Sequence, residues 1–227
     1  MNLLAVDTST RSTVLGLQVQ DRILDGSTNE VETHSRDILP SISSLLNEAG
    51  ITLSELDAVV FGQGPGSFTG LRIAVGVVQG LAYGLDIPVV PVSSMRCLAQ
   101  SLADGSTHRV FVALHARLEE IYYGTYRLDA GLAVHDGKES VLDVSQLESL
   151  DDAGWTLVGD ALFLRNRIES STGVAFQSVA EVSVPRVEDL LTLGVHELQQ
   201  GSAVSALNAS PVYLRETVAD RPGDRKS

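Results

Sequence analysis

A short apolar run that leads through a glycine-rich turn into a long apolar helix most limits the folds open to this chain. Residues 58–61 are all apolar, which is typical of a strand buried on both faces of a sheet. Glycines and small polar residues follow at 63–70, and the pattern then predicts a helix over about 71–84. A buried strand that feeds a helix in this way belongs to a sheet with helices on its faces. The chain is therefore predicted to have an α/β fold.

Similar patterns elsewhere predict two mixed sheets flanked by helices, in two lobes. Strands are expected at 3–6, 14–19, 23–26, 57–62 and 89–92, and later at 110–114, 121–126 and 155–160. Further helices are expected at 35–49, from Ser93 or Ser94 to about 102, and at 186–199. Asp104, Gly105 and Ser106 are turn formers, so we place a lobe boundary there, between 1–105 and 106–227.

The charge balance argues against one class of function. The chain has 29 acidic and 16 basic side chains, for a formal net charge of −13. Nucleic acids are polyanions, and proteins bind them with clustered Lys and Arg. The densest basic stretch here is the tail with Arg221, Arg225 and Lys226. The balance therefore argues against a nucleic-acid binder that acts alone.

Cysteine content and targeting signals bear on the compartment. Cys97 is the one cysteine, which excludes an internal disulfide and a cysteine-clustered zinc site, and we expect it to pack as a small apolar residue. The first residues carry no basic region ahead of their apolar run, and no stretch approaches about 18 uninterrupted apolar residues. We therefore expect a soluble cytoplasmic protein that spans no membrane.

The turn after the first strand is a candidate phosphate or metal loop. Asp7, Thr8 and Ser9 supply a carboxylate and small hydroxyls, which can hold a divalent cation or let backbone amides approach a phosphate. A plain polar turn has the same composition.

The histidines offer no helical pair, so a metal site built on paired histidines is not expected. They lie at positions 34, 108, 115, 135 and 196.

The turn at 63–70 has the glycines of a phosphate cradle but departs from each standard motif. It has no Walker lysine, and its spacing fits neither the dinucleotide fingerprint nor the nucleophile elbow. What remains is a strand-to-helix turn in which Ser67 or Thr69 is expected to cap the following helix.

Three glycines mark one face of that helix. Gly76, Gly80 and Gly84 recur at every fourth residue, so they lie on the same side. Each glycine inside a helix costs about 1 kcal/mol relative to alanine, which suggests that another backbone lies close to this face. Two interpretations remain: the face packs on the protein's own sheet, or it contacts a partner subunit, flanked by Ile73 and Val77.

Several segments together resemble a known family. They are residues 4–10, 34–35, 39–40, 64–72 and 92–94, with weaker matches at 116–117, 159–160 and 211–215. In this order they resemble the bacterial TsaB family, also called YeaZ, and the string at 64–72 is the most specific part. The family usually has Asp where this chain has His115, so no role is carried over to that position.

The resemblance implies an actin-like ATPase fold (the ASKHA, ribonuclease H-like fold) with two lobes. It also implies a non-catalytic subunit, required for threonylcarbamoylation of adenosine 37 in tRNAs that read codons beginning with A. In that scheme a larger TsaD-type subunit does the catalysis and holds its metal with paired histidines. A TsaE-type ATPase takes part as well, and this chain itself needs no cofactor and makes little direct contact with tRNA.

In the family, two helices of the N-terminal lobe pair with the catalytic subunit or, in isolation, with a second copy of the chain. Here they correspond to about 36–49 and 69–84, and the glycine face is then interpreted as part of this interface. The candidate contact residues are Ile42, Leu46, Ile73, Gly76, Val77, Gly80 and Gly84.

Two enzymes are the competing interpretations. A small-molecule kinase of the same fold, similar to type III pantothenate kinase, would need Asp-x-Gly-Asn-Thr in the first turn, where this chain has Asp7, Thr8, Ser9 and Thr10. A metallopeptidase would need metal ligands that the sequence does not bring together.

Overall fold

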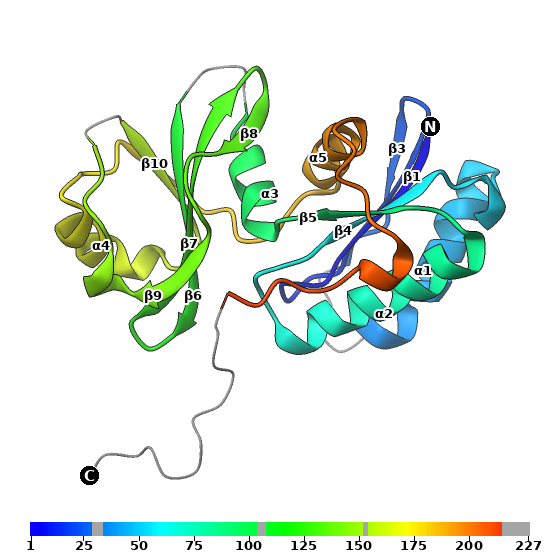
Figure 1. Ribbon diagram of the computed structural model, residues 1–227, viewed down its shortest axis with the longest axis horizontal. Helices are drawn as coiled ribbons and strands as arrows, with labels where there is room; N and C mark the ends of the chain where they lie inside the picture. Colours follow the sequence, from blue (N-terminus) through cyan, green and yellow to red (C-terminus); the bar gives the residue numbers. More distant parts are fainter. Residues whose placement is uncertain (29–33, 104–107, 152–153, 215–227) are drawn as a thin grey trace, which may run out of the picture.

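Two mixed sheets with helices on their faces form the molecule (Figure 1). The computed structural model describes residues 1–28, 34–103, 108–151 and 154–214, with side chains described from residue 38 onward in the first helix. The arrangement confirms the predicted α/β class. The predicted boundary at Asp104, Gly105 and Ser106 and the basic tail with Arg221, Arg225 and Lys226 lie outside the described residues.

The first sheet contains five strands in the order β3-β2-β1-β4-β5. They are β1 (Asn2–Asp7), β2 (Val14–Val19), β3 (Arg22–Asp25), β4 (Ala58–Gly62) and β5 (Val89–Val92). Strands β1, β2 and β3 form an antiparallel meander, while β4 runs parallel to both β1 and β5. The central strands are buried on both faces, as their continuous apolar runs require.

Helices cover both faces of this sheet. Helices α1 (His34–Ala49) and α2 (Phe68–Leu85) lie on one face, and α5 (Val187–Gln199) lies on the other (Figure 1). Successive strand residues point to opposite faces, so Leu4 packs in the α1–α2 core while Leu3 packs with α5. A short 3₁₀ helix, η1 (Leu53–Glu55), precedes β4.

The second sheet has six strands, five of them in the order β11-β10-β6-β7-β8, with β9 paired to β7. They are β6 (Arg109–Arg117), β7 (Glu120–Asp129), β8 (Leu132–His135), β9 (Ser140–Asp143), β10 (Trp155–Gly159) and β11 (Ser178–Ala180). Helix α4 (Arg165–Thr172) packs on one face and α3 (Ser94–Gln100) on the other. Short 3₁₀ helices lie at η2 (Val144–Gln146) and η3 (Leu162–Leu164).

The strict division of the chain at residue 105 is wrong for its last part. Helix α5 comes from the second half of the sequence but packs on β1, β4 and β5 of the first sheet. The close approach depends on Gly194, where a Cβ would lie 2.5 Å from Val60 Cγ2. The 3₁₀ helix η4 (Ala206–Asn208) packs against α2, and Val204 pairs with Val89 of β5. The apolar stripe of α5 therefore completes the first core.

Polar side chains of the buried helix α3 tie the two sheets together. Arg96 donates from Nε to the Ala133 carbonyl at 2.7 Å and from Nη1 to Glu197 at 2.5 Å. The Gln100 amide donates to the Gly131 carbonyl and accepts from the Ala133 N–H, both at 2.8 Å. Because α5 packs on the first sheet and β8 belongs to the second, these bonds connect α3 to the parts built around both sheets.

Candidate functional site

The carboxylate of Asp7 is enclosed at the end of β1. Ser9 N donates to one of its oxygens at 2.6 Å, and Ser94 Oγ donates to the other at 2.8 Å. A Cβ at Gly62 would lie 1.8 Å from Asp7 Oδ2, so the neighbouring strand leaves room for this carboxyl only because it has glycine there. Burial raises the pKa of Asp7, against the opposing effect of these hydrogen bonds. The Asp7 side chain thus connects the end of β1 to α3 by a hydrogen bond.

Thr8 and Ser9 hold the turn against the start of α2. Thr8 Oγ1 donates to the Gly70 carbonyl at 2.6 Å, and Ser67 N donates to the Ser9 carbonyl at 2.7 Å. Gly70 is required here, because a Cβ would lie 1.8 Å from the Thr8 carbonyl oxygen. Ser67 Oγ accepts from Gly70 N at 3.2 Å, which confirms Ser67 as the N-cap of the helix.

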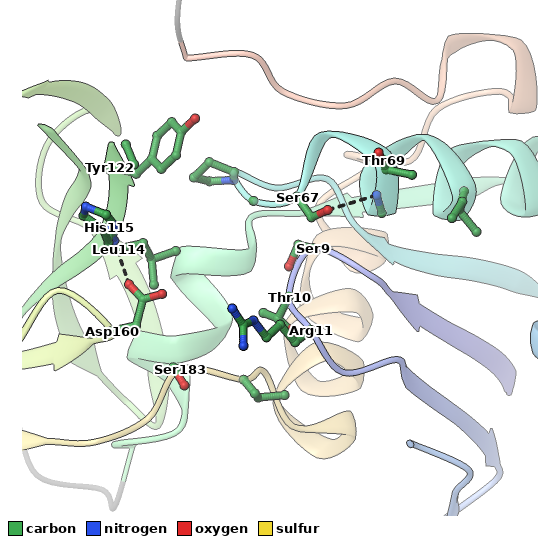
Figure 2. A pocket seen from close by; sticks show the side chains of 16 residues that line it. Ser9, Thr10, Arg11, Ser67, Thr69, Leu114, His115, Tyr122, Asp160 and Ser183 are labelled. Atoms are coloured by element: carbon green, nitrogen blue, oxygen red, sulfur yellow. Dashed lines mark hydrogen bonds between the residues drawn. The ribbon is translucent and has the colours of Figure 1, made fainter. Parts of the chain in front are cut away.

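A cleft of about 890 Å³ opens beside this turn, at the ends of the central strands of both sheets. Ser9, Thr10 and Arg11 lie on one side of it, with Ser67 and Thr69 above them (Figure 2). Ligands of open α/β sheets bind in the crevice at the carboxyl ends of the strands, and this cleft occupies that place. Asp7 and Thr8 do not line it, so the sequence-predicted triplet contributes only Ser9.

The opposite wall comes from the second sheet. His115 and Tyr122 lie there with Asp160, which follows β10 (Figure 2). The backbone N–H of His115 donates to Asp160 Oδ1 at 2.6 Å, and the imidazole ring packs edge-on against Phe163. His115 therefore shapes the wall through its backbone and ring.

The glycine face of α2 is a second candidate site. A Cβ built at Gly76, Gly80 or Gly84 would meet no atom within 4 Å, and all three positions are exposed. The interpretation that this face packs on the protein's own sheet is therefore excluded. Ile73 and Val77 beside it are half-buried. None of the described residues covers the three glycines of this face.

Helix α2 is also long and apolar enough to cross a membrane by length and composition. About a third of it is buried, and its inner residues pack on the first sheet as part of a core. Those residues are Ala74, Val78 and Ala82. Its apolar character thus divides into one side that packs internally and one that is exposed.

The prediction for α1 is wrong at both residues. Ile42 and Leu46 are 2% and 5% exposed and belong to the core between α1 and the first sheet. The apolar stripe of a surface helix turns to its own sheet, so these side chains do not reach a partner. Leu39 is the exposed apolar residue of this helix, at 52%.

The structure also bears on Cys97 and on possible metal ligands. Cys97 is buried among apolar residues, as predicted, and burial raises the pKa of its thiol. Within the described ranges, His, Cys, Asp and Glu side chains form no group of three or more that could hold a metal ion.

Sequence reasoning missed Arg11 and did not single out Asp160 as a site residue. Both lie just beyond predicted strands, which is the signal that could have found them, because strand ends meet at one edge of a sheet. That Arg11 and Asp160 line the same cleft depends on how the two sheets are placed relative to each other, which cannot be predicted from local sequence patterns.

Comparisons with known proteins agree with this architecture. The family model described as "TsaD: tRNA N6-adenosine threonylcarbamoyltransferase" matches residues 29–219. The tRNA threonylcarbamoyladenosine biosynthesis protein TsaB of Escherichia coli K12 is 33% identical over 96% of both chains. TsaB of Bacillus subtilis is 31% identical over 97% of this chain and 96% of its own.

Among solved structures, YeaZ from Pseudomonas aeruginosa superposes with a TM-score of 0.86 at 38% identity, covering 94% of this chain and 99% of that one. Both the sequence likeness and the fold extend over nearly the whole chain, including α5 and the second sheet. The chain therefore belongs to the TsaB (YeaZ) family of tRNA threonylcarbamoyladenosine biosynthesis proteins.

Proposed function

We propose that this chain is the non-catalytic scaffold subunit for threonylcarbamoylation of adenosine 37 in tRNAs that read codons beginning with A. It activates a TsaD-type catalytic subunit by pairing with it through α2 of the N-terminal lobe. The observation that carries this proposal is the open glycine face, where no atom of the described residues lies within 4 Å of a Cβ built at Gly76, Gly80 or Gly84.

The composition of this face fits a close helix contact. Glycines are unfavourable in a helix, by about 1 kcal/mol each, and give no benefit on a surface that faces water. Without side chains they let a second backbone approach, while Ile73 and Val77 at the edge supply apolar contact. Tyr83, which is 70% exposed, extends the apolar surface toward the end of the helix. A helix of a partner is the occupant that uses all of these features.

The interior of the β1 turn supports an accessory role. Both oxygens of Asp7 accept hydrogen bonds inside the chain, and Thr8 bonds to the backbone of α2. These groups, which could otherwise act on a phosphate or a metal, hold the lobe together. The net charge of −13 supports the further proposal that partners supply most of the tRNA contact.

The family model that matches residues 29–219 carries the name of the transferase, which supports a partner of related fold. We propose pairing through equivalent helices, with a TsaE-type ATPase completing the assembly and a homodimer forming through the same face when the chain is alone. The setting of this activity is the cytoplasm.

The test combines co-purification with reconstitution. Gly80→Arg places a long charged side chain on the face and should abolish co-purification with the catalytic subunit and its stimulation of tRNA modification. Thr192→Arg adds the same side chain on an exposed position of α5, on the opposite face of the first sheet, and should leave both unchanged. Circular dichroism checks that both variants fold.

Two results would refute the proposal. Binding that survives in folded Gly80→Arg would place the interface elsewhere. Rapid phosphotransfer from ATP to a small molecule by the isolated chain would favour the kinase alternative over a scaffold.

A further inference from the structure

The cleft between the two sheets holds Arg11, which has no partner among the residues that the structure describes. Arg11 is exposed on the cleft wall, and none of the residues described in the structure accepts a hydrogen bond from it or pairs with it. In an acidic protein a guanidinium has many carboxylates to choose from, so one that pairs with none of the described residues and lines a cleft of about 890 Å³ is unusual.

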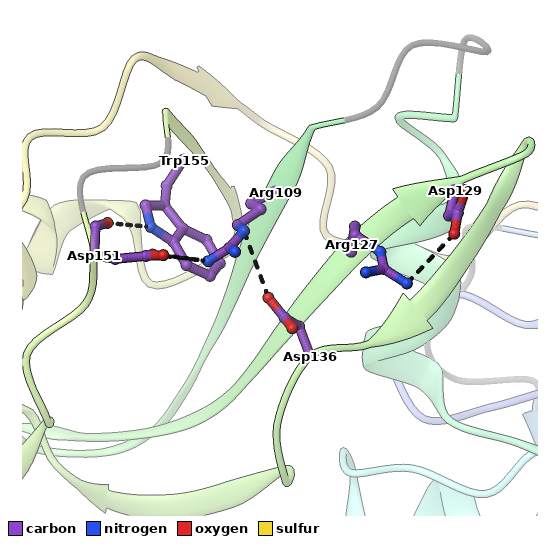
Figure 3. Close-up of polar contacts among 6 residues, drawn as sticks. All are labelled: Arg109, Arg127, Asp129, Asp136, Asp151 and Trp155. Carbon is purple, nitrogen blue, oxygen red and sulfur yellow. Dashed lines mark hydrogen bonds and ion pairs between the residues drawn. The ribbon is translucent and has the colours of Figure 1, made fainter.

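The remaining arginines that the structure describes show the contrast. Arg109 lies between Asp136 and Asp151, at 3.6 and 2.7 Å, and Arg127 lies 3.3 Å from Asp129 (Figure 3). Arg72 stacks on the Phe68 ring. Others form ion pairs with Glu or Asp: Arg22, Arg96, Arg117, Arg165, Arg167 and Arg186.

Ser9 supplies a second polar group, next to Arg11. The residue lines the cleft and is 4% exposed, and its Oγ, which lies near the Asp7 carboxyl group, makes no hydrogen bond of ordinary geometry with any described residue. A buried hydroxyl that lacks a partner costs about 1–3 kcal/mol, so such groups are uncommon unless something else completes them.

Asp160 faces this pair from the second sheet. One of its oxygens accepts the His115 N–H, and the other accepts no hydrogen bond from any residue that the structure describes. Arg11 and Asp160 line the same cleft but form no ion pair with each other. Within the described part of the chain, the cleft therefore presents an unpaired cation on one wall and an unpaired carboxylate oxygen on the other (Figure 2).

We propose that this cleft binds a small molecule with an oxyanion, a phosphate or a carboxylate, at one end and a hydroxyl or amine at the other. Arg11 holds the oxyanion, with the Ser9 hydroxyl as a second donor, and the free oxygen of Asp160 accepts from the hydroxyl or amine. The volume of about 890 Å³ lies in the range of small-molecule sites, and Ile73, Leu114 and Tyr122 provide apolar contact.

Amide NMR spectra of the isotope-labelled full chain test this site with defined probes at constant ionic strength. Glycerol phosphate and glycerate carry an oxyanion and hydroxyls, inorganic phosphate carries the oxyanion alone, and glycerol carries the hydroxyls alone. Glycerol phosphate, glycerate or both should shift the amides of Ser9 and Thr10 on one wall and of Asp160 on the other. Which of the two binds more tightly distinguishes a phosphate from a carboxylate ligand. Glycerol should shift none of these amides.

Two variants assign the roles. Arg11→Gln should weaken binding by about tenfold or more, because it removes a charge-assisted hydrogen bond. Arg22→Gln, an arginine in an exposed ion pair away from the cleft, is the matched control and should bind as the wild type does. Asp160→Asn keeps an oxygen for the His115 amide and should narrow the affinity difference between glycerol phosphate and inorganic phosphate.

Two results would overturn the proposal. One is that neither glycerol phosphate nor glycerate shifts the cleft amides. The other is that they shift them equally in Arg11→Gln and in the wild type.

Discussion

Replacing Gly80 by alanine should make the isolated chain more stable and the complex weaker. The added Cβ meets no atom within 4 Å, and the backbone at Gly80 has no positive φ that alanine would strain. Only the helix propensity changes in the monomer, which gives a gain of about 1 kcal/mol in the free energy of unfolding. For a chain of this size that raises the melting temperature by about 2–4 °C.

Gly70→Ala is the matched control within the same helix. Its Cβ would lie 1.8 Å from the carbonyl oxygen of Thr8, which is backbone and cannot rotate away. Overpacking of this kind costs about 1–3 kcal/mol, which exceeds the gain in propensity. The same substitution in one helix should thus change stability in opposite directions at positions 70 and 80.

Urea unfolding measures this difference, at dilutions where light scattering shows a monomer. Affinity for the catalytic subunit is then measured for the same proteins, and Gly80→Ala should bind more weakly because its Cβ holds the two backbones apart. A Gly80→Ala monomer that is less stable than wild type would show that the face is covered within the chain. Unchanged affinity would show that close backbone approach is not needed for binding.

Three further predictions concern the packing of α1 and the charged groups Arg96 and Asp7. Ile42→Ala should lower the free energy of unfolding by about 2–5 kcal/mol, because it leaves a cavity in the α1 core. Leu39→Ala, at an exposed position of the same helix, should change it by less than about 0.5 kcal/mol; equal losses in urea melts would mean that the burial of α1 is assigned wrongly. Arg96→Met should cost about 1–3 kcal/mol, because it leaves the partly buried carboxylate of Glu197 without this partner, and adding Glu197→Met should recover part of that loss in the same melts. Burial raises the pKa of Asp7 above 3.8, so the folded chain holds this proton more tightly than the unfolded chain, and stability falls as the pH rises from near 3.8 through the folded-state pKa. Asp7→Asn removes this titrating group. The urea midpoint of the variant minus that of the wild type should therefore increase with pH across this window, and a difference that does not change with pH would contradict the assignment.

The long, strongly patterned elements could be predicted from the sequence, and the short polar ones could not. Helix α2 could be predicted from its long, mostly apolar sequence, and strand β4 from its continuous apolar run. Helix α4 escaped prediction because it has eight residues, mostly polar, and Ile168 is its one large apolar residue in the core. Strands β8 and β9 have four residues each and gain their stability from pairing with β7. For β9 the paired residues are far apart in the sequence, whereas β8 forms a local hairpin with β7 whose strand pattern is too short to stand out.

The same reasoning explains the mixed result for the partner face. An apolar stripe at helical spacing states that a helix buries one side, and for α1 that side is the protein's own core. Glycines on a helix face indicate that another backbone approaches closely, but they do not show whether that backbone belongs to the same chain or to a partner. Gly70 and Gly80 lie on one helix, yet the chain's own backbone fills the space at the first and nothing fills it at the second. Only the three-dimensional arrangement separates these cases.

The return of α5 to the first sheet has a consequence for how the chain is made. During synthesis, β1, β4 and β5 emerge early, but one of their faces stays bare until residues 187–199 have left the ribosome. Two further contacts also form late. Val89 of edge strand β5 exchanges backbone hydrogen bonds with Val204, and the Gln63 carbonyl accepts a hydrogen bond from the amide of Val212. The nascent first half therefore exposes a Val-rich sheet while the whole second sheet is being translated. A chain that ended after β11 would therefore contain every strand of both sheets and still lack the helix that completes the first core.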